Sequence, residues 1–246
     1  MRGVSIDTEN VLEKLSKSEI VKGYTLIGGT ALSLSLGHRL SEDIDLCIWG
    51  KTTKIQDTEA IYQSLVELRT KGDVVILLDS DFQKDFLIDD VKVTFFNDPT
   101  EHLPSEKHKR KYNKLSIASV PAIAGMKACV TLNRAKFRDY YDLFSIAYGG
   151  HCSLVEILSE ANEYKPYYNT RMILQNIQSF ADTKEENIDL LKPIYDIKTN
   201  EIEYFFRQLI GMHSRMDKNQ IKNIMKVNRM EENTKYHDSQ IPMKFT

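Results

Sequence analysis

Residues 25–46 read Thr-Leu-Ile-Gly-Gly-Thr-Ala-Leu-Ser-Leu-Ser-Leu-Gly-His-Arg-Leu-Ser-Glu-Asp-Ile-Asp-Leu, a pattern typical of the opening of an α/β fold. It predicts a strand that runs into a diglycine, then a short helix, and then a second strand that carries Asp43 and Asp45. The diglycine, Gly28 and Gly29, lets the backbone approach a triphosphate, and the amides of the following helix present partial positive charge to it. Carboxylates at alternate positions of a strand point to one face, where they can hold Mg²⁺. The stretch therefore predicts a site for a metal-bound triphosphate.

The composition is that of an ordinary soluble globular protein. A net charge of -2 and a hydrophobic share of 41% over 246 residues argue against the disordered and histone-like classes. The three cysteines, Cys47, Cys129 and Cys152, are far apart and lack C-x-x-C spacing, so neither a disulfide framework nor a zinc site is indicated. No apolar run approaches the roughly 20 residues of a membrane helix, and the start lacks an apolar signal core. We therefore expect a cytoplasmic protein with no membrane partner.

The pattern along the chain predicts an α/β (α+β) fold with a mixed sheet followed by helices. All six prolines lie at Pro99 or later, and residues 101–114 are polar and basic, so the sheet should be complete by about residue 117. We expect a core domain over residues 1–117 and a helical domain over 118–246 that closes the cleft. Strands are expected over 23–28, 43–49, 73–79, 84–88 and 91–97. Helices are expected over 8–17, 30–37, 55–70, 120–132, 136–148, 153–163, 170–180 and 201–228.

Two motifs, in this order, carry a resemblance to a known family. The first is the diglycine stretch 28–32 continuing to 38–46, and the second is Lys127 followed by Arg-Ala-Lys-Phe-Arg-Asp-Tyr-Tyr-Asp-Leu at 134–143. Over residues 20–150 the chain resembles the DNA polymerase β-like nucleotidyltransferases and, within them, the AbiEii/AbiGii toxin family, which is related to the MenT toxins. The resemblance implies a polymerase β-like core and Mg²⁺-dependent transfer of a nucleoside monophosphate from an NTP. It also implies a bacterial toxin with a cognate antitoxin and a tRNA 3′ end as the acceptor.

The candidate catalytic residues follow from both motifs. Asp43 and Asp45 are expected to bind the metal, Lys127 to stabilise developing charge, and Asp142 either to orient Lys127 or to act as a base. Ser41 has two alternative roles: its hydroxyl could hydrogen-bond a phosphate or cap a turn. The candidate nucleotide-binding residues are Gly28, Gly29, Thr30, Arg39, Ser41, Arg134 and Arg138.

The second motif also has a geometry of its own. One continuous helix over residues 127–142 would place four side chains on one face: Lys127, Arg134, Arg138 and Asp142. Asp139 would lie off that face, and a break near Asn133 would remove the arrangement. The alternative is an exposed ion pair between residues four apart on a helix.

One position departs from the polymerase β-like pattern. Such enzymes usually add a third carboxylate on a later strand, where it helps to hold two Mg²⁺ ions roughly 4 Å apart. Here that strand reads Asp-Asp-Val-Lys-Val-Thr-Phe-Phe over residues 89–96, and Thr94 stands at the expected position. Asp90 lies about 13 Å away along a strand, which makes direct replacement implausible. Either two carboxylates suffice, with Lys127 and Asp142 supplying charge and proton handling, or activity has been lost.

A basic stretch over residues 106–114 separates the expected sheet from the helices. Its candidate RNA-binding residues are Lys107, Lys109, Arg110 and Lys111, and Tyr112 could stack on a base. A solvated loop is the alternative for such a charge run. Two other functions stay open. One is a small-molecule, antibiotic-type nucleotidyltransferase that would not need this stretch, and the other is a catalytically degenerate nucleotide-binding regulator.

Overall fold

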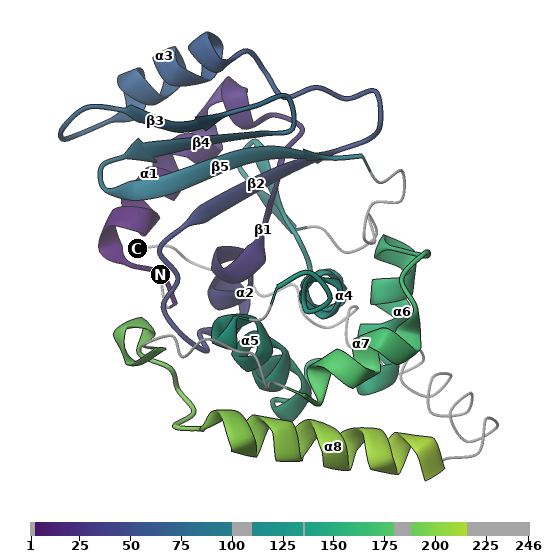
Figure 1. Cartoon of the computed structure of the whole chain (residues 1–246). Coiled ribbons are helices and arrows are strands. Elements are labelled where there is room, and N and C mark those ends of the chain that lie inside the picture. The colour runs from purple at the N-terminus through teal and green to yellow at the C-terminus, as the bar shows by residue number, and fades with distance from the viewer. Residues whose placement is uncertain (1–2, 100–109, 135, 180–187, 216–246) are drawn as a thin grey trace, which may run out of the picture. The chain divides into compact units, whose positions relative to one another are not determined.

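The computed structural model describes residues 3–99, 110–134, 136–179 and 188–215. Met1–Phe206 forms one compact unit, and a second unit begins at Arg207. The first unit is built on a seven-stranded sheet in the order β3-β4-β5-β2-β1-β7-β6 (Figure 1). The division of the chain after residue 117 stays a prediction.

The sheet is mixed, as predicted. The pairs β2–β5 and β1–β7 are parallel, whereas the other neighbours are antiparallel. The strands are β1 (Thr25–Ile27), β2 (Ile44–Trp49), β3 (Val75–Asp79), β4 (Gln83–Ile88), β5 (Val91–Asp98), β6 (Arg110–Tyr112) and β7 (Leu115–Ile117). The hairpin β6–β7 was not predicted. Its strands are three residues long, too short to show an alternating pattern, and Asn113 turns the chain with a φ of 53°.

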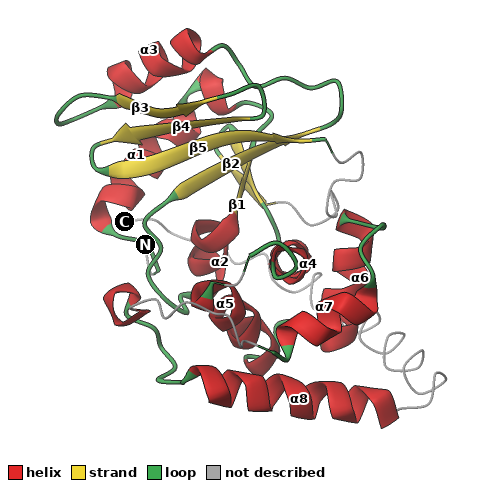
Figure 2. Cartoon of the chain, in the orientation of Figure 1, coloured by secondary structure: helices red, strands yellow, loops and turns green. Residues whose placement is uncertain are grey.

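Helices cover both faces of the sheet. Figure 1 places α1 and α3 on one side and α2 and α4 on the other, and Figure 2 shows the helices that follow the last strand. The α-helices are α1 (Ile6–Lys17), α2 (Gly28–Leu36), α3 (Thr58–Leu68), α4 (Val120–Val130), α5 (Phe137–Tyr148), α6 (Leu154–Tyr164), α7 (Thr170–Ile177) and α8 (Thr199–Arg215). Two 3₁₀ helices, η1 (Glu19–Val21) and η3 (Ile188–Leu191), complete the described elements. The part of the predicted last helix beyond residue 215 lies outside the described residues.

A continuous helix over residues 127–142 does not form. The chain leaves α4 after Val130 in a turn whose amides donate to the carbonyls of Cys129 and Val130. Lys136 is extended, with φ of -110° and ψ of 132°, before α5 begins at Phe137. The single-face arrangement of the second motif is therefore wrong, and its residues meet by folding of two helices rather than along one.

Successive side chains of β5 point to opposite faces of the sheet, one of which is the hydrophobic core. Val91, Val93 and Phe95 are buried in the hydrophobic core. Lys92 and Thr94, at the intervening positions, point to the other face. Within the described residues, no helix has the length and apolar character needed to cross a membrane.

Candidate active site

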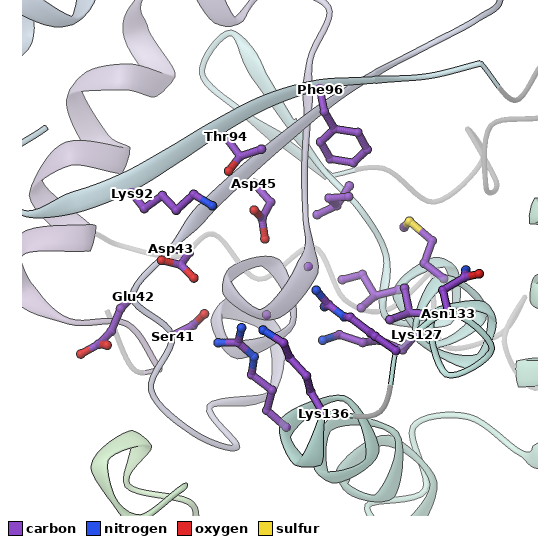
Figure 3. Close-up of a pocket in the computed structure, with 18 of the residues that line it drawn as sticks. Ser41, Glu42, Asp43, Asp45, Lys92, Thr94, Phe96, Lys127, Asn133 and Lys136 are labelled. Atoms are coloured by element: carbon purple, nitrogen blue, oxygen red, sulfur yellow. The ribbon is translucent and has the colours of Figure 1, made fainter. Parts of the chain in front are cut away.

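A pocket of about 510 Å³ opens on that face of the sheet, between the strands and the helices α4 and α5 (Figure 3). It brings together most of the side chains selected from the sequence. Those that line it are Gly28, Gly29, Arg39, Ser41, Asp43, Asp45, Lys127, Arg134 and Arg138. Thr30 and Asp142 lie behind its wall, in contact with lining residues.

The diglycine is required by the space around it. Gly28 has a φ of +71°, and a Cβ there would lie 2.6 Å from Oδ2 of Asp45. A Cβ on Gly29 would lie 2.7 Å from Nη2 of Arg39 and 3.0 Å from Oγ of Ser41. The first turn of α2 therefore approaches the polar groups of the pocket more closely than any other residue type allows.

The start of α2 is suited to an anion. Its N-cap residue, Ile27, makes no side-chain hydrogen bond to the helix amides, so the first turn lacks a side-chain cap. Thr30 lies on the inner side of that turn, and its hydroxyl is 2.9 Å from the Ser41 hydroxyl and contacts the carbonyl oxygen of Asp43. Thr30 thus holds the segment that leads into β2 beside the first turn of α2, whose Gly28 and Gly29 line the pocket.

Asp43 and Asp45 form the acidic side of the pocket. Burial, followed by the negative charge of Asp43, raises the pKa of the Asp45 carboxyl, while Lys127, Lys92 and Arg134 act in the opposite direction. A divalent cation between two such carboxylates would relieve their repulsion, and oxygen ligands are those that Mg²⁺ prefers. The donor set therefore fits the metal. In the pocket and elsewhere among the described residues, no group of three or more His, Cys, Asp or Glu side chains is arranged to hold a metal ion.

The third carboxylate of the polymerase β-like pattern is absent from its expected place. In the parallel pairing of β2 with β5, Asp45 is the Cα partner of Thr94, so these two side chains share a face. Figure 3 shows Thr94 beside Asp45 in the pocket. The departure noted in the sequence is therefore a real feature of the site.

A buried ion network forms the basic side. Nζ of Lys127 on α4 lies 2.7 Å from Oδ1 of Asp139 and 2.7 Å from Oδ2 of Asp142, both on α5. Asp142 also accepts from Nε and Nη2 of Arg39 at 2.7 and 2.9 Å and from Nε2 of His38 at 2.7 Å. Two carboxylates behind the wall thus hold two cations that line the pocket.

Asp142 is a carboxylate in this network. Burial alone would raise its pKa, but the charges of Lys127 and Arg39 and the hydrogen bonds from His38 and Arg39 hold the pKa well below its usual range. A group with so low a pKa is a weak base. Of the two roles predicted for Asp142, the geometry favours orienting Lys127.

Lys127 is correspondingly a fixed cation. Burial lowers the pKa of its ammonium, but Asp142 and Asp139 more than offset this, and the pKa is raised. Lys127 is therefore charged at neutral pH and cannot swing freely, because two carboxylates hold it. A positive charge fixed in advance is what stabilises developing negative charge most effectively.

Asp139 was missed as a site residue. It is fully buried, and its Oδ2 accepts from Nε of Arg134 at 2.9 Å in addition to its contact with Lys127. The signal available was its spacing of three residues from Asp142, which puts both on one face of a short helix. The assumption of one long helix placed it on the wrong side.

The pocket also has an apolar wall that no motif indicated. It consists of Ile27, Phe96, Ile123, Met126, Val130 and Tyr164. Phe96 follows Thr94 by two residues on β5, and this spacing was the one signal for it. The hydroxyl of Tyr164 donates to Asp98 at the end of β5, which fixes the ring against the strand.

Two of the candidate RNA-binding residues lie on an edge strand. Arg110 and Lys111 are exposed on β6, and neither lines the pocket. Nζ of Lys111 lies 3.1 Å from Oγ of Ser116 on β7. Lys107 and Lys109 lie outside the described residues.

Comparison with known proteins identifies the family. A family model described as "Nucleotidyl transferase AbiEii toxin, Type IV TA system" matches residues 10–225. The chain belongs to the AbiEii nucleotidyltransferase toxin family. The predicted family is thereby confirmed, and with it the coarser prediction of a nucleotidyltransferase; the family belongs to type IV toxin–antitoxin systems.

One relative and two solved structures show limited sequence identity to this AbiEii protein. An uncharacterized protein of Aquifex aeolicus (strain VF5) is 29% identical over 214 residues, which cover 85% of this chain and 97% of that protein. The crystal structure of JHP933 from Helicobacter pylori is similar in fold, with a TM-score of 0.53, 19% identity, and coverage of 92% of this chain and 95% of that one. MenT4, a nucleotidyltransferase toxin of Mycobacterium tuberculosis H37Rv, has a TM-score of 0.46 and 12% identity over 89% of this chain and 88% of that one.

Proposed function

We propose that this AbiEii protein transfers a nucleoside monophosphate from an NTP to a hydroxyl group at the 3′ end of a tRNA, and that it is the toxin of a toxin–antitoxin pair. Family membership supports the chemistry and the toxin role. One observation carries the assignment to this site: a single pocket joins carboxylates at the start of β2 with cations from α4, α5 and the turn between them. These residues are Asp43, Asp45, Lys127, Arg134 and Arg138.

The two sides of the pocket suit the two ends of an NTP. The triphosphate would lie at the uncapped start of α2, within reach of Lys127 and Arg134, because helix amides and cations both favour phosphate oxygens. The nucleoside would lie against the apolar wall, where Phe96 and Tyr164 provide aromatic surface. Base identity would then depend on the shape of that wall.

The reaction needs little covalent chemistry from the protein. An acceptor hydroxyl oxygen bonds to the α-phosphorus as the bond to the bridging oxygen of the β-phosphate breaks. Pyrophosphate leaves, and the hydroxyl proton passes to water. Mg²⁺ held by Asp43 and Asp45 would neutralise phosphate oxygens and orient the triphosphate.

The protein's own side chains do the rest. Lys127 places a fixed charge beside the phosphates, and Arg134, which is half-exposed, can adjust to them. Asp142 and Asp139 hold these cations in place before the substrate arrives. Lys127 is therefore charged and in position before the reaction begins.

The partners of the reaction are proposed on separate grounds. The basic residues 107–111 suit an RNA backbone, which supports a tRNA acceptor. Membership of a toxin–antitoxin family implies a cognate antitoxin. The three cysteines, all among the described residues, are buried and none is in a disulfide, which agrees with the proposed cytoplasmic location.

Labelled NTPs test the proposal. The protein is incubated with each α-labelled NTP and Mg²⁺, in one reaction with total cellular RNA and in another with a small-molecule extract of cells, and Asp45→Asn serves as the inactive control. Label in the tRNA fraction, lost in the variant, is expected. Label in small molecules alone would favour the antibiotic-type alternative, and nucleotide binding without any transfer would favour the degenerate regulator that Thr94 suggested.

A further inference from the structure

A second carboxylate–lysine pair lies on the sheet side of the pocket. Asp85 on β4 is the Cα partner of Thr94 on β5, which is in turn the partner of Asp45 on β2. The three side chains therefore form a row on one face across adjacent strands. Asp85 is buried, with 6% of its surface exposed. A carboxylate is thus present in the row, one strand beyond the position that Thr94 occupies.

Neighbouring side chains bind both carboxylate oxygens of Asp85. Its Oδ1 accepts from Nε2 of Gln83 at 2.9 Å, and its Oδ2 lies 2.8 Å from Nζ of Lys92. Burial raises the pKa of Asp85, but Lys92, Gln83 and Thr94 more than offset this, and the pKa is lowered. Both oxygens therefore serve to hold polar side chains of the sheet, and the lysine is the charged one among them.

Lys92 points at the metal-binding carboxylates. It stands two residues before Thr94 on β5, on the same face, and it lines the pocket. In Figure 3 its side chain extends from the strand toward Asp43 and Asp45. The hydrogen bond to Asp85 comes first among the causes that raise the pKa of Lys92, and attraction to Asp43 and Asp45 adds to it. The side chain is 40% exposed, so a ligand can reach it.

We propose that Lys92, held by Asp85, supplies the positive charge that a second metal ion would otherwise bring to the carboxylate side of the pocket. Its ammonium takes the place that a second Mg²⁺ has in sites with three carboxylates, contacts the phosphates of the NTP, and leaves the pocket with a single divalent ion. Thr94 then fits the row because a third carboxylate would compete with Asp85 for Lys92. This inference rests on the proposed function, since it concerns the same triphosphate.

Substitution of Lys92 tests the catalytic part. Lys92→Met should lower kcat/KM for nucleotide transfer about 100-fold, the cost of losing one fixed charge-stabilising group. Lys92→Arg keeps the charge and should restore most of the activity. Lys84→Met is the matched control, because Lys84 is also paired with an aspartate, Asp79, on the neighbouring strand but does not line the pocket. Circular dichroism confirms that each variant is folded.

Asp85 is a positioning residue, and a double-mutant cycle tests it. Asp85→Asn alone should lower kcat/KM, because the lysine loses its anchor. In the Lys92→Met background the same change should cost nothing further, since there is no ammonium left to position. Additive losses would instead mean that Asp85 acts only through the fold.

Counting metal ions separates this inference from the proposed function. With a non-hydrolysable NTP analogue, electron paramagnetic resonance should find one Mn²⁺ per wild-type site, and Lys92→Met should bind the analogue about 10-fold more weakly. Two Mn²⁺ ions in the wild type, or equal activity and affinity in Lys92→Met, would overturn the role of Lys92 even if transfer to RNA is observed. Conversely, one Mn²⁺ and weakened binding in the variant would support it even if no acceptor is labelled.

Discussion

Nζ of Lys127 on α4 lies 2.7 Å from Oδ2 of Asp142 on α5, and both side chains are buried. The same carboxylate accepts two hydrogen bonds from Arg39, which lies in the segment between α2 and β2. Two distant parts of the chain are therefore joined to one carboxylate behind the wall of the pocket. This arrangement ties the folding of the protein to the position of its candidate catalytic lysine.

Removing Asp142 should destabilise the fold. Asp142→Ala leaves Lys127 and Arg39 with a buried partner missing, and such a loss costs about 3–5 kcal/mol. The free energy of unfolding in urea measures it. Glu13→Ala, which breaks an exposed ion pair with Lys17 on α1, is the control and should leave the unfolding midpoint nearly unchanged. A wild-type midpoint for Asp142→Ala would contradict the network.

The free energy of unfolding should fall at acid pH because Asp142 becomes protonated. Because the pKa of Asp142 is lower in the folded protein than in the unfolded chain, its stabilisation is fully present above about pH 4, the ordinary pKa of an aspartate. As the pH drops below that value, the unfolded chain takes up the proton first and the stabilisation is lost. Denaturation curves between pH 7 and pH 3 should show this loss. Asp142→Asn should show a shallower dependence, and an equally steep one would assign the loss to other groups.

How much of this site could be predicted depends on the range of the interactions. The strand, diglycine and Asp43–Asp45 pair could be predicted because each follows from spacing within a few residues. Asp139 could not, because its contact with Lys127 exists only after a turn separates α4 from α5. The pairing of Lys92 with Asp85 likewise depends on the register of β4 against β5, which no local pattern encodes.

Gly28→Ala should abolish activity beyond its effect on stability. Its Cβ would lie 2.6 Å from Oδ2 of Asp45 and would displace that carboxylate. Gly150→Ala is the matched control, because Gly150 has the same φ of +71° with no atom within 4 Å of the added carbon. Both variants should lose about 1–2 kcal/mol to backbone strain, measured by urea unfolding. Transfer activity should be lost in Gly28→Ala alone, and equal activity in both would exclude a role for the close approach.

Asp45→Asn should separate metal binding from stability. The pKa of Asp45 is raised, chiefly by burial, so its ionised form opposes folding at neutral pH and a neutral asparagine should fold at least as stably in the absence of metal. Mg²⁺ or Mn²⁺ binds the folded wild type and should raise its thermal unfolding temperature, but it should not raise that of Asp45→Asn. Calorimetric scans with and without metal give both results. A metal-dependent shift in the variant would place the metal elsewhere.

Replacing Arg110 and Lys111 should weaken binding of the tRNA acceptor and leave binding of the NTP unchanged. Both are exposed on β6 and outside the pocket, so Arg110→Ala with Lys111→Ala should leave NTP affinity unchanged. Affinity for tRNA should fall and should depend less steeply on salt concentration, because a protein that makes fewer phosphate contacts releases fewer counterions when it binds. Filter binding across a salt series measures this. Lys71→Ala, at an exposed lysine paired with Asp90, is the control. An unchanged salt dependence in the double variant would show that the acceptor does not cross β6.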